Sequence, residues 1–483
     1  MLDRIISNLI AFAKTNLSLD ERDEFYAIGK ILDILHVGSY NPVKPDCNLS
    51  APPDAILDEL VDYCVNNGII EDYEAEGLID KVMDALSLPP SVIGEVFKSI
   101  VKENGSRAAT DWFYKYCVDN AYVKRAKLDK NPRFDVGKVT VTINKSKPEF
   151  RDPQKAKVGN SVSGGYPKCV ICRENEGYAP RNKRTLRTVD VTLGGEKFFW
   201  QYSPYGYFNE HGIVVNSKHI PMYVDKTTFY KLMDFVDLFP HYFLGCNAPL
   251  PRIGGSVLAH DHYQGGGETL PLHKAGIRKH LKLRNYPNVE ICIADWPGTV
   301  LRISSTDRDV VAEIAELVRS AWVGYNNEKL GIIASDNEGI HNTVSPTVVK
   351  AGDKYVMNII LRSNITSEQY PEGVFHAHPE FHEIKKESIG LIEAQGLFIL
   401  PGRLEAELAE VERCIEKGSL DNELERFKLV YDEAKAIFDG GVSAHEAVER
   451  EIGSICYRIL QNTAVFKSDD DFMSFLRGVG FNE

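Results

Sequence analysis

The sequence contains no run of apolar residues as long as the roughly 18–20 that a membrane-spanning helix needs. Its first residues mix charge with apolar residues at helical spacing and lack the apolar core of a secretory signal peptide. An excess of basic residues is also missing: the formal net charge is -13, which argues against general binding of nucleic acid. These absences predict a cytoplasmic protein with neither a membrane nor a nucleic-acid partner.

Cysteine is too scarce for a disulfide scaffold, with nine residues in a chain of 483. Seven of the nine are isolated and are typical of buried thiols in a reducing compartment; they are Cys47, Cys64, Cys117, Cys246, Cys292, Cys414 and Cys456. Only Cys169 and Cys172 have the spacing of half a metal site.

The length predicts more than one folding unit, because a single core rarely exceeds about 250–300 residues. Helical spacing of apolar residues dominates both ends of the chain. We therefore expect a helical N-terminal region over residues 1–125, a catalytic unit over 126–305, a second unit over 306–400 and a helical C-terminal region over 401–483.

The middle of the chain alternates short strand patterns with turns. Residues 188–193 and 197–202 predict one hairpin around Gly194-Gly195, and residues 344–350 and 355–362 predict another. Residues 227–243 have the spacing of an amphipathic helix. Because the strands are short and paired as hairpins, we expect an α+β fold with antiparallel sheet rather than a doubly wound parallel sheet.

The chemistry centres on a block of two histidines, His260 and His262, with Asp261 between them and glycines on both sides. If this block is extended, the two histidines share one face and Asp261 lies on the other. The flanking glycines let backbone amides approach a phosphate closely. Alone, such a triplet is more often a strand end with two surface histidines.

Support for a site comes from Cys169 and Cys172 and from a further histidine, His219. Two thiolates and two imidazoles, with His260 as the fourth ligand, complete a tetrahedral structural zinc site with no open position. The alternative is a redox pair or chance spacing of the cysteines. With His260 held as a ligand, His262 is left beside it as a reactive base or nucleophile.

At this point the motifs resemble galactose-1-phosphate uridylyltransferase, and more closely its second, longer class. The resemblance covers nearly the whole chain and rests on the runs 169–178 and 205–211, the block from His260 to Gly266, and the stretch 375–382. The first class has proline where Asp261 stands and lacks the double glycine after Gln264, so details taken from it transfer less directly.

The resemblance implies a histidine-triad type of fold with two related α+β halves, and a homodimer. It implies transfer of UMP from UDP-glucose to galactose 1-phosphate by two displacements through a uridylyl-histidine, with ping-pong kinetics. His262 matches the nucleophile of the family and Gln264 matches its partner for a phosphate oxygen.

Further candidates for substrate binding follow from position. Asn209 and Glu210 lie where the family contacts the ribose, although a polar pair at a strand end is an equally good explanation. Gly255 and Ser256 are candidates for holding phosphate. Arg181, with Arg184 nearby, is a candidate for the diphosphate or a plain surface residue.

A second histidine cluster comprises His376, His378 and His382. We interpret His376 and His378 as substrate contacts, with a satisfied structural role as the alternative; a second metal site, with His341 and Glu268 as guessed further ligands, is the less favoured interpretation. Two other functions stay open from the sequence. One is a related nucleotidyltransferase or phosphorylase acting on an adenine nucleotide. The other is a zinc-stabilised nucleotide-binding module without turnover.

Overall fold

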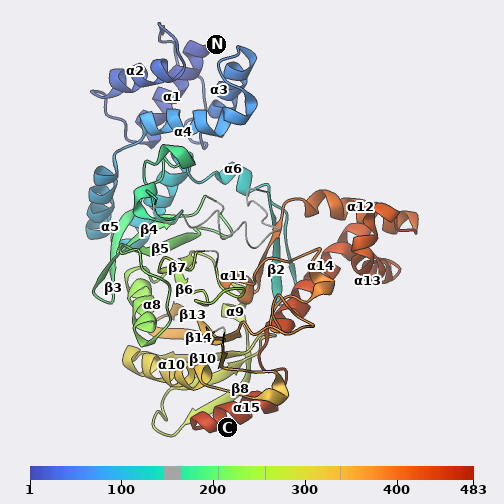
Figure 1. The fold of residues 1–483 in the computed structure, drawn as a ribbon. Helices are drawn as coiled ribbons and strands as arrows, with labels where there is room; N and C mark the ends of the chain where they lie inside the picture. The colour runs from blue at the N-terminus through green and yellow to red at the C-terminus, as the bar shows by residue number, and fades with distance from the viewer. Residues whose placement is uncertain (146–164, 205, 256, 338) are drawn as a thin grey trace.

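The structure is a computed structural model that describes residues 1–145, 165–204, 206–255, 257–337 and 339–483. An eleven-stranded sheet forms its centre, with helical regions at both ends of the chain (Figure 1). Within the described residues, no helix combines the length and the apolarity needed to cross a membrane.

The N-terminal region is helical, as predicted. Its helices are α1 (Leu2–Asn16), α2 (Glu24–Ile34), α3 (Asp54–Asn66), α4 (Ala75–Leu86), α5 (Pro90–Asp119) and α6 (Arg125–Leu128). In α1 the residues Ile5, Ile6, Leu9 and Ala13 recur at helical spacing and are all buried, so that one stripe packs on the neighbouring helices.

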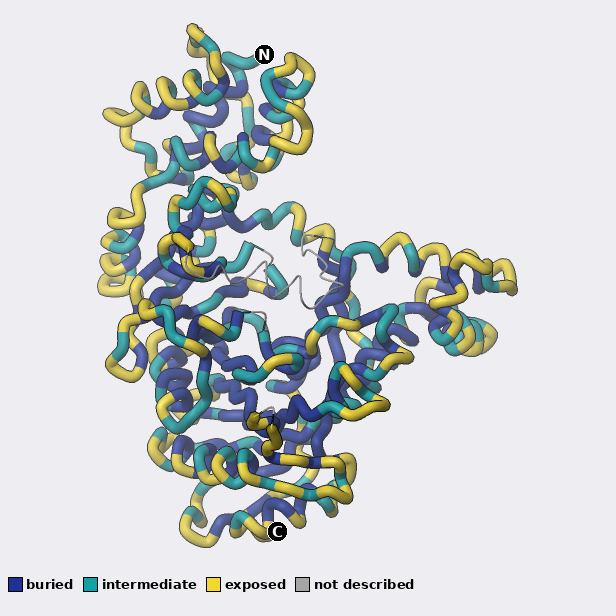
Figure 2. Tube along the Cα trace, in the orientation of Figure 1, coloured by how far each residue is buried: buried dark blue, intermediate teal, exposed yellow. Residues whose placement is uncertain are grey.

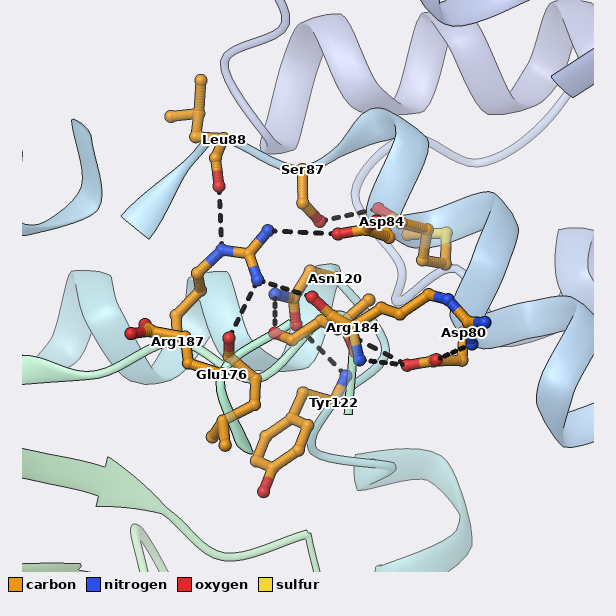
Figure 3. Close-up of polar contacts among 12 residues, drawn as sticks. Asp80, Asp84, Ser87, Leu88, Asn120, Tyr122, Glu176, Arg184 and Arg187 are labelled. Atoms are coloured by element: carbon orange, nitrogen blue, oxygen red, sulfur yellow. Dashed lines mark hydrogen bonds and ion pairs between the residues drawn. The ribbon is translucent and has the colours of Figure 1, made fainter. Parts of the chain in front are cut away.

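Two arginines fasten this helical region to the rest of the chain (Figure 3). Arg184 donates to the Asp80 carboxylate at 2.8 Å, and Arg187 donates through Nε to the Leu88 carbonyl oxygen at 2.8 Å. Asp80 and Arg187 are largely buried, so both contacts are shielded from water. Arg184, a candidate for diphosphate binding in the sequence, is thus engaged in an ion pair.

The main sheet has the strand order β16-β8-β9-β10-β14-β13-β6-β7-β5-β4-β3, and all its pairings are antiparallel. Its strands are β3 (Val189–Leu193), β4 (Glu196–Tyr202), β5 (Gly212–Asn216), β6 (Phe243–Gly245), β7 (His262–Gly266), β8 (Ile277–Leu283), β9 (Glu290–Ala294), β10 (Val300–Ser305), β13 (Asn342–Ala351), β14 (Lys354–Ser363) and β16 (Phe481–Asn482).

This sheet consists of two halves with the same topology. In the first half, three strands in series (β3, β4, β5) are followed by helix α8 (Lys226–Leu238) and the pair β6 and β7, in the spatial order 3-4-5-7-6. The second half repeats this with β8, β9, β10, helix α10 (Arg308–Val323), β13 and β14, in the order 8-9-10-14-13. The halves meet where β6 pairs with β13.

The two faces of the sheet differ in chemistry. One face is apolar and is covered by α8 and α10, which contact each other and strands of both halves. The other face carries His262 and Gln264 on β7 and is covered near Gly245 by the short helix α11 (Leu391–Ala394). Side chains alternate between faces along each strand, so one sheet provides both a core and a polar site.

A second layer is built from a three-stranded sheet and the C-terminal helices. The strands are β1 (Arg133–Val136), β2 (Val139–Asn144) and β15 (Leu397–Pro401), with β15 parallel to β2. The helices of this layer are α9 (Pro271–Lys274), α12 (Leu404–Lys417), α13 (Lys428–Phe438) and α14 (Ala444–Thr463). Helix α15 (Asp469–Val479) instead packs against α10 and belongs to the apolar core of the main sheet. In Figures 1 and 2, α12 and α13 project as an arm with exposed residues at its tip. A separate two-stranded sheet joins β11 (Ser335–Asp336) and β12 (Gly339–Ile340).

The predicted α+β class and both predicted hairpins are confirmed. The predicted helix over residues 227–243 is wrong in its last part, because α8 ends at Leu238 and residues 243–245 form β6. Pro240 explains the end, since proline cannot continue a helix. The division at residue 305 stays a prediction, while the topology repeats from β8 onward.

We expect Gly453 to be required for the packing of α14 on β1. A Cβ placed there would lie 2.3 Å from Cβ of Val136. Gly453→Ala should therefore lower the free energy of unfolding by about 1–3 kcal/mol. The control is Gly94→Ala in α5, where a Cβ meets nothing within 4 Å and alanine should stabilise by about 0.5–1 kcal/mol. Urea unfolding measures both, and equal changes would contradict this account.

Candidate functional site

His262 is the first residue of β7 and lies opposite Val215 of β5. The loop that precedes it turns tightly at Gly254, where a Cβ would lie 2.2 Å from the carbonyl oxygen of Ala248. Only glycine fits so close an approach of two backbone segments. The glycines before the histidine block therefore shape the loop that delivers His260 and His262 to the edge of the sheet.

The four predicted metal ligands converge. Sγ of Cys169 lies 3.4 Å from Sγ of Cys172 and 3.3 Å from Nδ1 of His260. Sγ of Cys172 lies 3.2 Å from Nδ1 of His219. All four ligand atoms lie within 4.8 Å of one another, and no other group of this kind occurs among the described residues. Such separations fit a tetrahedral ion with bonds of about 2.0–2.3 Å.

The donor chemistry also fits a metal. His260 donates from Nε2 to the backbone oxygen of Asn216 at 2.8 Å, so that its Nδ1 carries the lone pair that faces the thiols. A hydrogen bond from Cys172 lowers the pKa of Cys169 to about 7, and the same contact with burial raises the pKa of Cys172 to about 11. A bound cation removes this conflict, because it takes both cysteines as thiolates.

The loop that holds the two cysteines is fixed from below by Asn175. Its side-chain nitrogen donates to the backbone oxygens of Cys169 and Cys172, at 2.8 Å each. Arg181 donates to the same Cys169 oxygen at 2.9 Å and to the Asn175 side chain at 2.7 Å. The structure thus places Arg181 beneath the cysteine loop, where it supports the metal ligands.

His262 is oriented by the residue two positions before it. Its Nδ1 donates to the backbone oxygen of His260 at 2.7 Å, which leaves the lone pair on Nε2. The side chain is buried, and burial lowers the pKa of His262 to about 4. At neutral pH the ring is therefore an uncharged imidazole with one defined nucleophilic nitrogen.

Gln264 follows on the same face of β7 and is oriented by His211. Nε2 of His211 donates to Oε1 of Gln264 at 3.3 Å, while Nδ1 of His211 accepts from the backbone of Tyr207 at 3.5 Å. Burial lowers the pKa of His211 to about 4, so the neutral tautomer persists. The amide NH₂ of Gln264 is thereby turned away from His211 and is available as a donor.

The sequence did not single out His211 as a site residue, although it lies within the run 205–211 that carried the resemblance. No spacing rule connects a residue before β5 with a glutamine on β7, because their proximity arises from pairing of the two strands. The pairing of Gly212 with Gly265 is what brings His211 next to Gln264.

Asn209 and Glu210 lie in the turn before β5. Asn209 is exposed, and its backbone oxygen accepts from Gly267 at 3.2 Å. Glu210 is buried in a left-handed conformation with φ 56°, and its carboxylate approaches Gly267. The turn therefore packs directly on the glycines that follow Gln264, at the end of β7 remote from the cysteines.

The remaining candidates lie elsewhere on this side of the sheet. Gly255 is close to Asn247, since a Cβ on it would lie 3.0 Å from the Asn247 side-chain nitrogen; Ser256 lies outside the described residues. His376 is buried, which lowers its pKa to about 4, and His378 stacks on Tyr370 at 4.0 Å.

The second histidine cluster does not form a metal site in the described part of the chain. His378 and His382 each place Nε2 against a backbone oxygen, of Val374 and Ala377 respectively. Among the guessed further ligands, Nδ1 of His341 lies 2.8 Å from the Asn364 side chain, and Glu268 accepts from Arg133 at 3.1 Å. These residues do not converge with the cluster on one point.

Comparison with known proteins gives a consistent result. Residues 44–221 match the family model "Galactose-1-phosphate uridyl transferase, N-terminal domain", and residues 235–425 match its C-terminal counterpart. A galactose-1-phosphate uridylyltransferase of Bifidobacterium longum subsp. longum is 47% identical over 501 residues, covering 99% of this chain and 97% of that relative. A Fusobacterium nucleatum subsp. nucleatum protein of that name is 36% identical, covering 99% and 98%.

We expect the chain, purified without chelator, to carry close to one metal ion. Cys172→Ser should lose most of it, because one of the two thiolates is removed. Cys47→Ser is the control, since Cys47 is remote from the cluster. Elemental analysis by mass spectrometry measures metal per chain. Wild-type protein with less than about a tenth of an equivalent of metal per chain would contradict a four-ligand metal site.

Proposed function

The chain belongs to the galactose-1-phosphate uridylyltransferase family and is an enzyme, a nucleotidyltransferase, and on this premise we propose that it transfers UMP from UDP-glucose to galactose 1-phosphate through His262. UDP-galactose and glucose 1-phosphate are the products. The uridylyl group is held covalently on the histidine between two displacements, which gives ping-pong kinetics.

The reaction begins with attack of Nε2 of His262 on the α-phosphorus of UDP-glucose. A nitrogen–phosphorus bond forms, the bond from the α-phosphorus to the bridging oxygen breaks, and glucose 1-phosphate leaves with the electron pair. In the second step, a phosphate oxygen of galactose 1-phosphate attacks the same phosphorus and His262 leaves. No proton need be lost by His262, since its attacking nitrogen carries none.

The observation that carries this proposal is the hydrogen bond from Nδ1 of His262 to the His260 backbone oxygen, at 2.7 Å. Attack places a positive charge on the imidazole ring, and a carbonyl oxygen that accepts from Nδ1–H stabilises that charge. The same bond fixes the ring before reaction, so little reorganisation is needed. A neutral ring with pKa about 4 is ready to attack without deprotonation.

Gln264 is proposed to donate its amide to a non-bridging oxygen of the α-phosphate, with its orientation set by His211.

We propose zinc as the ion of the cysteine–histidine site, since two thiolates and two imidazoles suit it; when bound, it would supply structural rigidity alone. Asn209 and Glu210 are proposed for the ribose, and Gly255 and Ser256 for phosphate. His376 and His378 stay predicted substrate contacts, and the homodimer stays a prediction.

Two other functions are alternatives to this proposal. Action on an adenine nucleotide would use the same histidine with another base, and the residues described above do not discriminate between bases. A binding module without turnover has no use for a buried imidazole whose nucleophilic nitrogen is fixed, so the orientation of His262 favours an enzyme.

A burst experiment without acceptor tests the covalent route. Wild type mixed with UDP-glucose should release about one equivalent of glucose 1-phosphate and gain the mass of a uridylyl group, because covalent catalysis forms one adduct per site. His262→Asn should show neither, because it lacks the attacking nitrogen. His445→Asn, on the exposed surface of α14, is the matched control. Rapid quench measures the release of glucose 1-phosphate, and intact mass spectrometry measures the adduct. A wild type that shows neither burst nor adduct would contradict the proposed reaction, and adenine nucleotides would be tested next.

The role of His211 predicts a graded response. His211→Phe keeps an aromatic ring against Tyr207 but loses the donor to Gln264, so adduct formation should slow by about tenfold or more, the usual order for one oriented donor. His211→Gln restores a donor and should recover part of the rate. Single-turnover rates at saturating UDP-glucose measure this. A full rate in His211→Phe would mean that Gln264 needs no such support.

A further inference from the structure

Three buried polar side chains on the face of the sheet that carries His262 have donor groups without hydrogen-bond partners in the described chain. They are the Nδ2 group of Asn247, the hydroxyl of Ser345, and the Nε and Nη1 groups of Arg362. Asn247, Ser345 and Arg362 are at most 1% exposed. We call these three residues the donor strip.

Strand pairing places the donor strip in one line with His262. Gly245 pairs with Gln264 on one side and with Thr347 on the other. Two residues further along each strand, this register sets Asn247 between His262 and Ser345. The backbone bond from Cys246 to Pro346 shows that the pairing continues beyond Gly245. Neighbouring strands are about 5 Å apart, so Asn247 is an immediate neighbour of His262.

Arg362 completes the strip from β14. Ser345 pairs with Ile360, so Arg362 is the diagonal neighbour of Ser345, within reach of a long side chain. One short segment joins the two ends of the strip: Arg362 donates from Nη2 to the Ile389 oxygen at 2.7 Å, and Asn247 accepts from the Leu391 backbone at 2.8 Å. Both side chains therefore lie on the face of the sheet that carries His262.

The charge of Arg362 is not matched by the protein. Arg362 makes no ion pair with a carboxylate of the described residues. Glu393, the carboxylate close enough to affect it, pairs with Lys385 at 2.9 Å and accepts from the Gly390 backbone. Burial lowers the pKa of Arg362 to about 10, so the guanidinium stays charged at neutral pH. An unpaired buried donor destabilises the folded chain, and a buried unpaired cation destabilises it more.

We propose that the donor strip binds the phosphate of the sugar 1-phosphate, both as the leaving group of UDP-glucose and as the attacking phosphate of the acceptor. A phosphate monoester dianion supplies the charge and the acceptor oxygens that these donors lack. The position fits, because the β-phosphate of a nucleotide sugar lies one bridging oxygen away from the phosphorus that His262 attacks. This assignment rests on the proposed function for its source of phosphate.

Arg302 offers a matched control. It lies on the same face of the sheet, on β10. All three of its guanidinium nitrogens donate hydrogen bonds within the protein, to the Asn358 side chain and to the backbone oxygens of Ala275 and Leu272. Its replacement removes a half-buried arginine without removing a free donor. A general effect of losing a guanidinium cation from this face would appear in Arg302→Gln as well as in Arg362→Gln.

The first test uses inorganic phosphate and no nucleotide. Calorimetric titration of metal-replete wild type with phosphate should show saturable binding. The affinity should weaken at least tenfold in Arg362→Gln and several-fold in Ser345→Ala, and it should be unchanged in Arg302→Gln. Ser345→Ala removes one hydroxyl that has no partner, so it carries the test if Arg362→Gln does not fold. Unchanged phosphate affinity in Ser345→Ala and in any folded Arg362 variant would overturn the assignment.

The second test separates this assignment from the proposed function. With the adduct preformed on wild type and on Arg362→Gln, the galactose 1-phosphate concentration for half-maximal discharge should rise at least tenfold in the variant, while affinity for UMP stays unchanged. An adduct that discharges with normal half-saturation in Arg362→Gln overturns the donor strip and leaves His262 in place. If phosphate binding is lost in the variants but the wild type itself forms no adduct with UDP-glucose, the anion site is retained and the proposed reaction is rejected.

Discussion

The site depends on one hydrogen bond, from Nδ1 of His262 to the backbone oxygen of His260. That oxygen can orient His262 only if His260 itself is fixed. His260 is held because its ring contacts Cys169 and Cys172 and donates to the backbone oxygen of Asn216. The cysteine loop is therefore part of the proposed reactive centre although it need not touch the substrate. The cysteine–histidine cluster and the proposed nucleophile are separated by one residue and so are positioned together.

The two faces of the main sheet have different roles: one is apolar and stabilises the fold, and the other carries the polar side chains of the site. Met357, Ile359 and Leu361 of β14 point to the helices and are buried in the largest apolar core, whereas Arg362, between Leu361 and Ser363, points to the other face. The apolar face supplies the burial that drives folding. The polar face carries buried donors whose cost is borne by the rest of the molecule and relieved when an anion is present.

Local motifs were sufficient to predict both hairpins and the half-site of Cys169 and Cys172, because each depends on residue types at short spacing. His219 and His260 were added from ligand chemistry, and the structure brings all four side chains together. Neither His211 beside Gln264 nor Arg362 beside Ser345 could be predicted in this way. Their positions follow from strand registers between segments far apart in the chain, which no single sequence specifies by spacing. The correct end of the helix before β6 could have been predicted from the sequence, because Pro240 cannot continue a helix.

The repeated topology explains why the reactive residues and the unpaired cation lie on different halves. His262 is on β7, in the first half, and Arg362 is on β14, which holds the same place in the second half. Because β6 and β13 pair across the junction, these two equivalent strands lie on either side of it and present one continuous face. On the proposed function, a ligand with two adjacent phosphates would lie over this face, with the second phosphate met by the long side chain of Arg362 across β6 and β13. Duplication of a strand arrangement would then yield two equivalent positions, of which one carries the proposed nucleophile and the other provides charge for the proposed departing group.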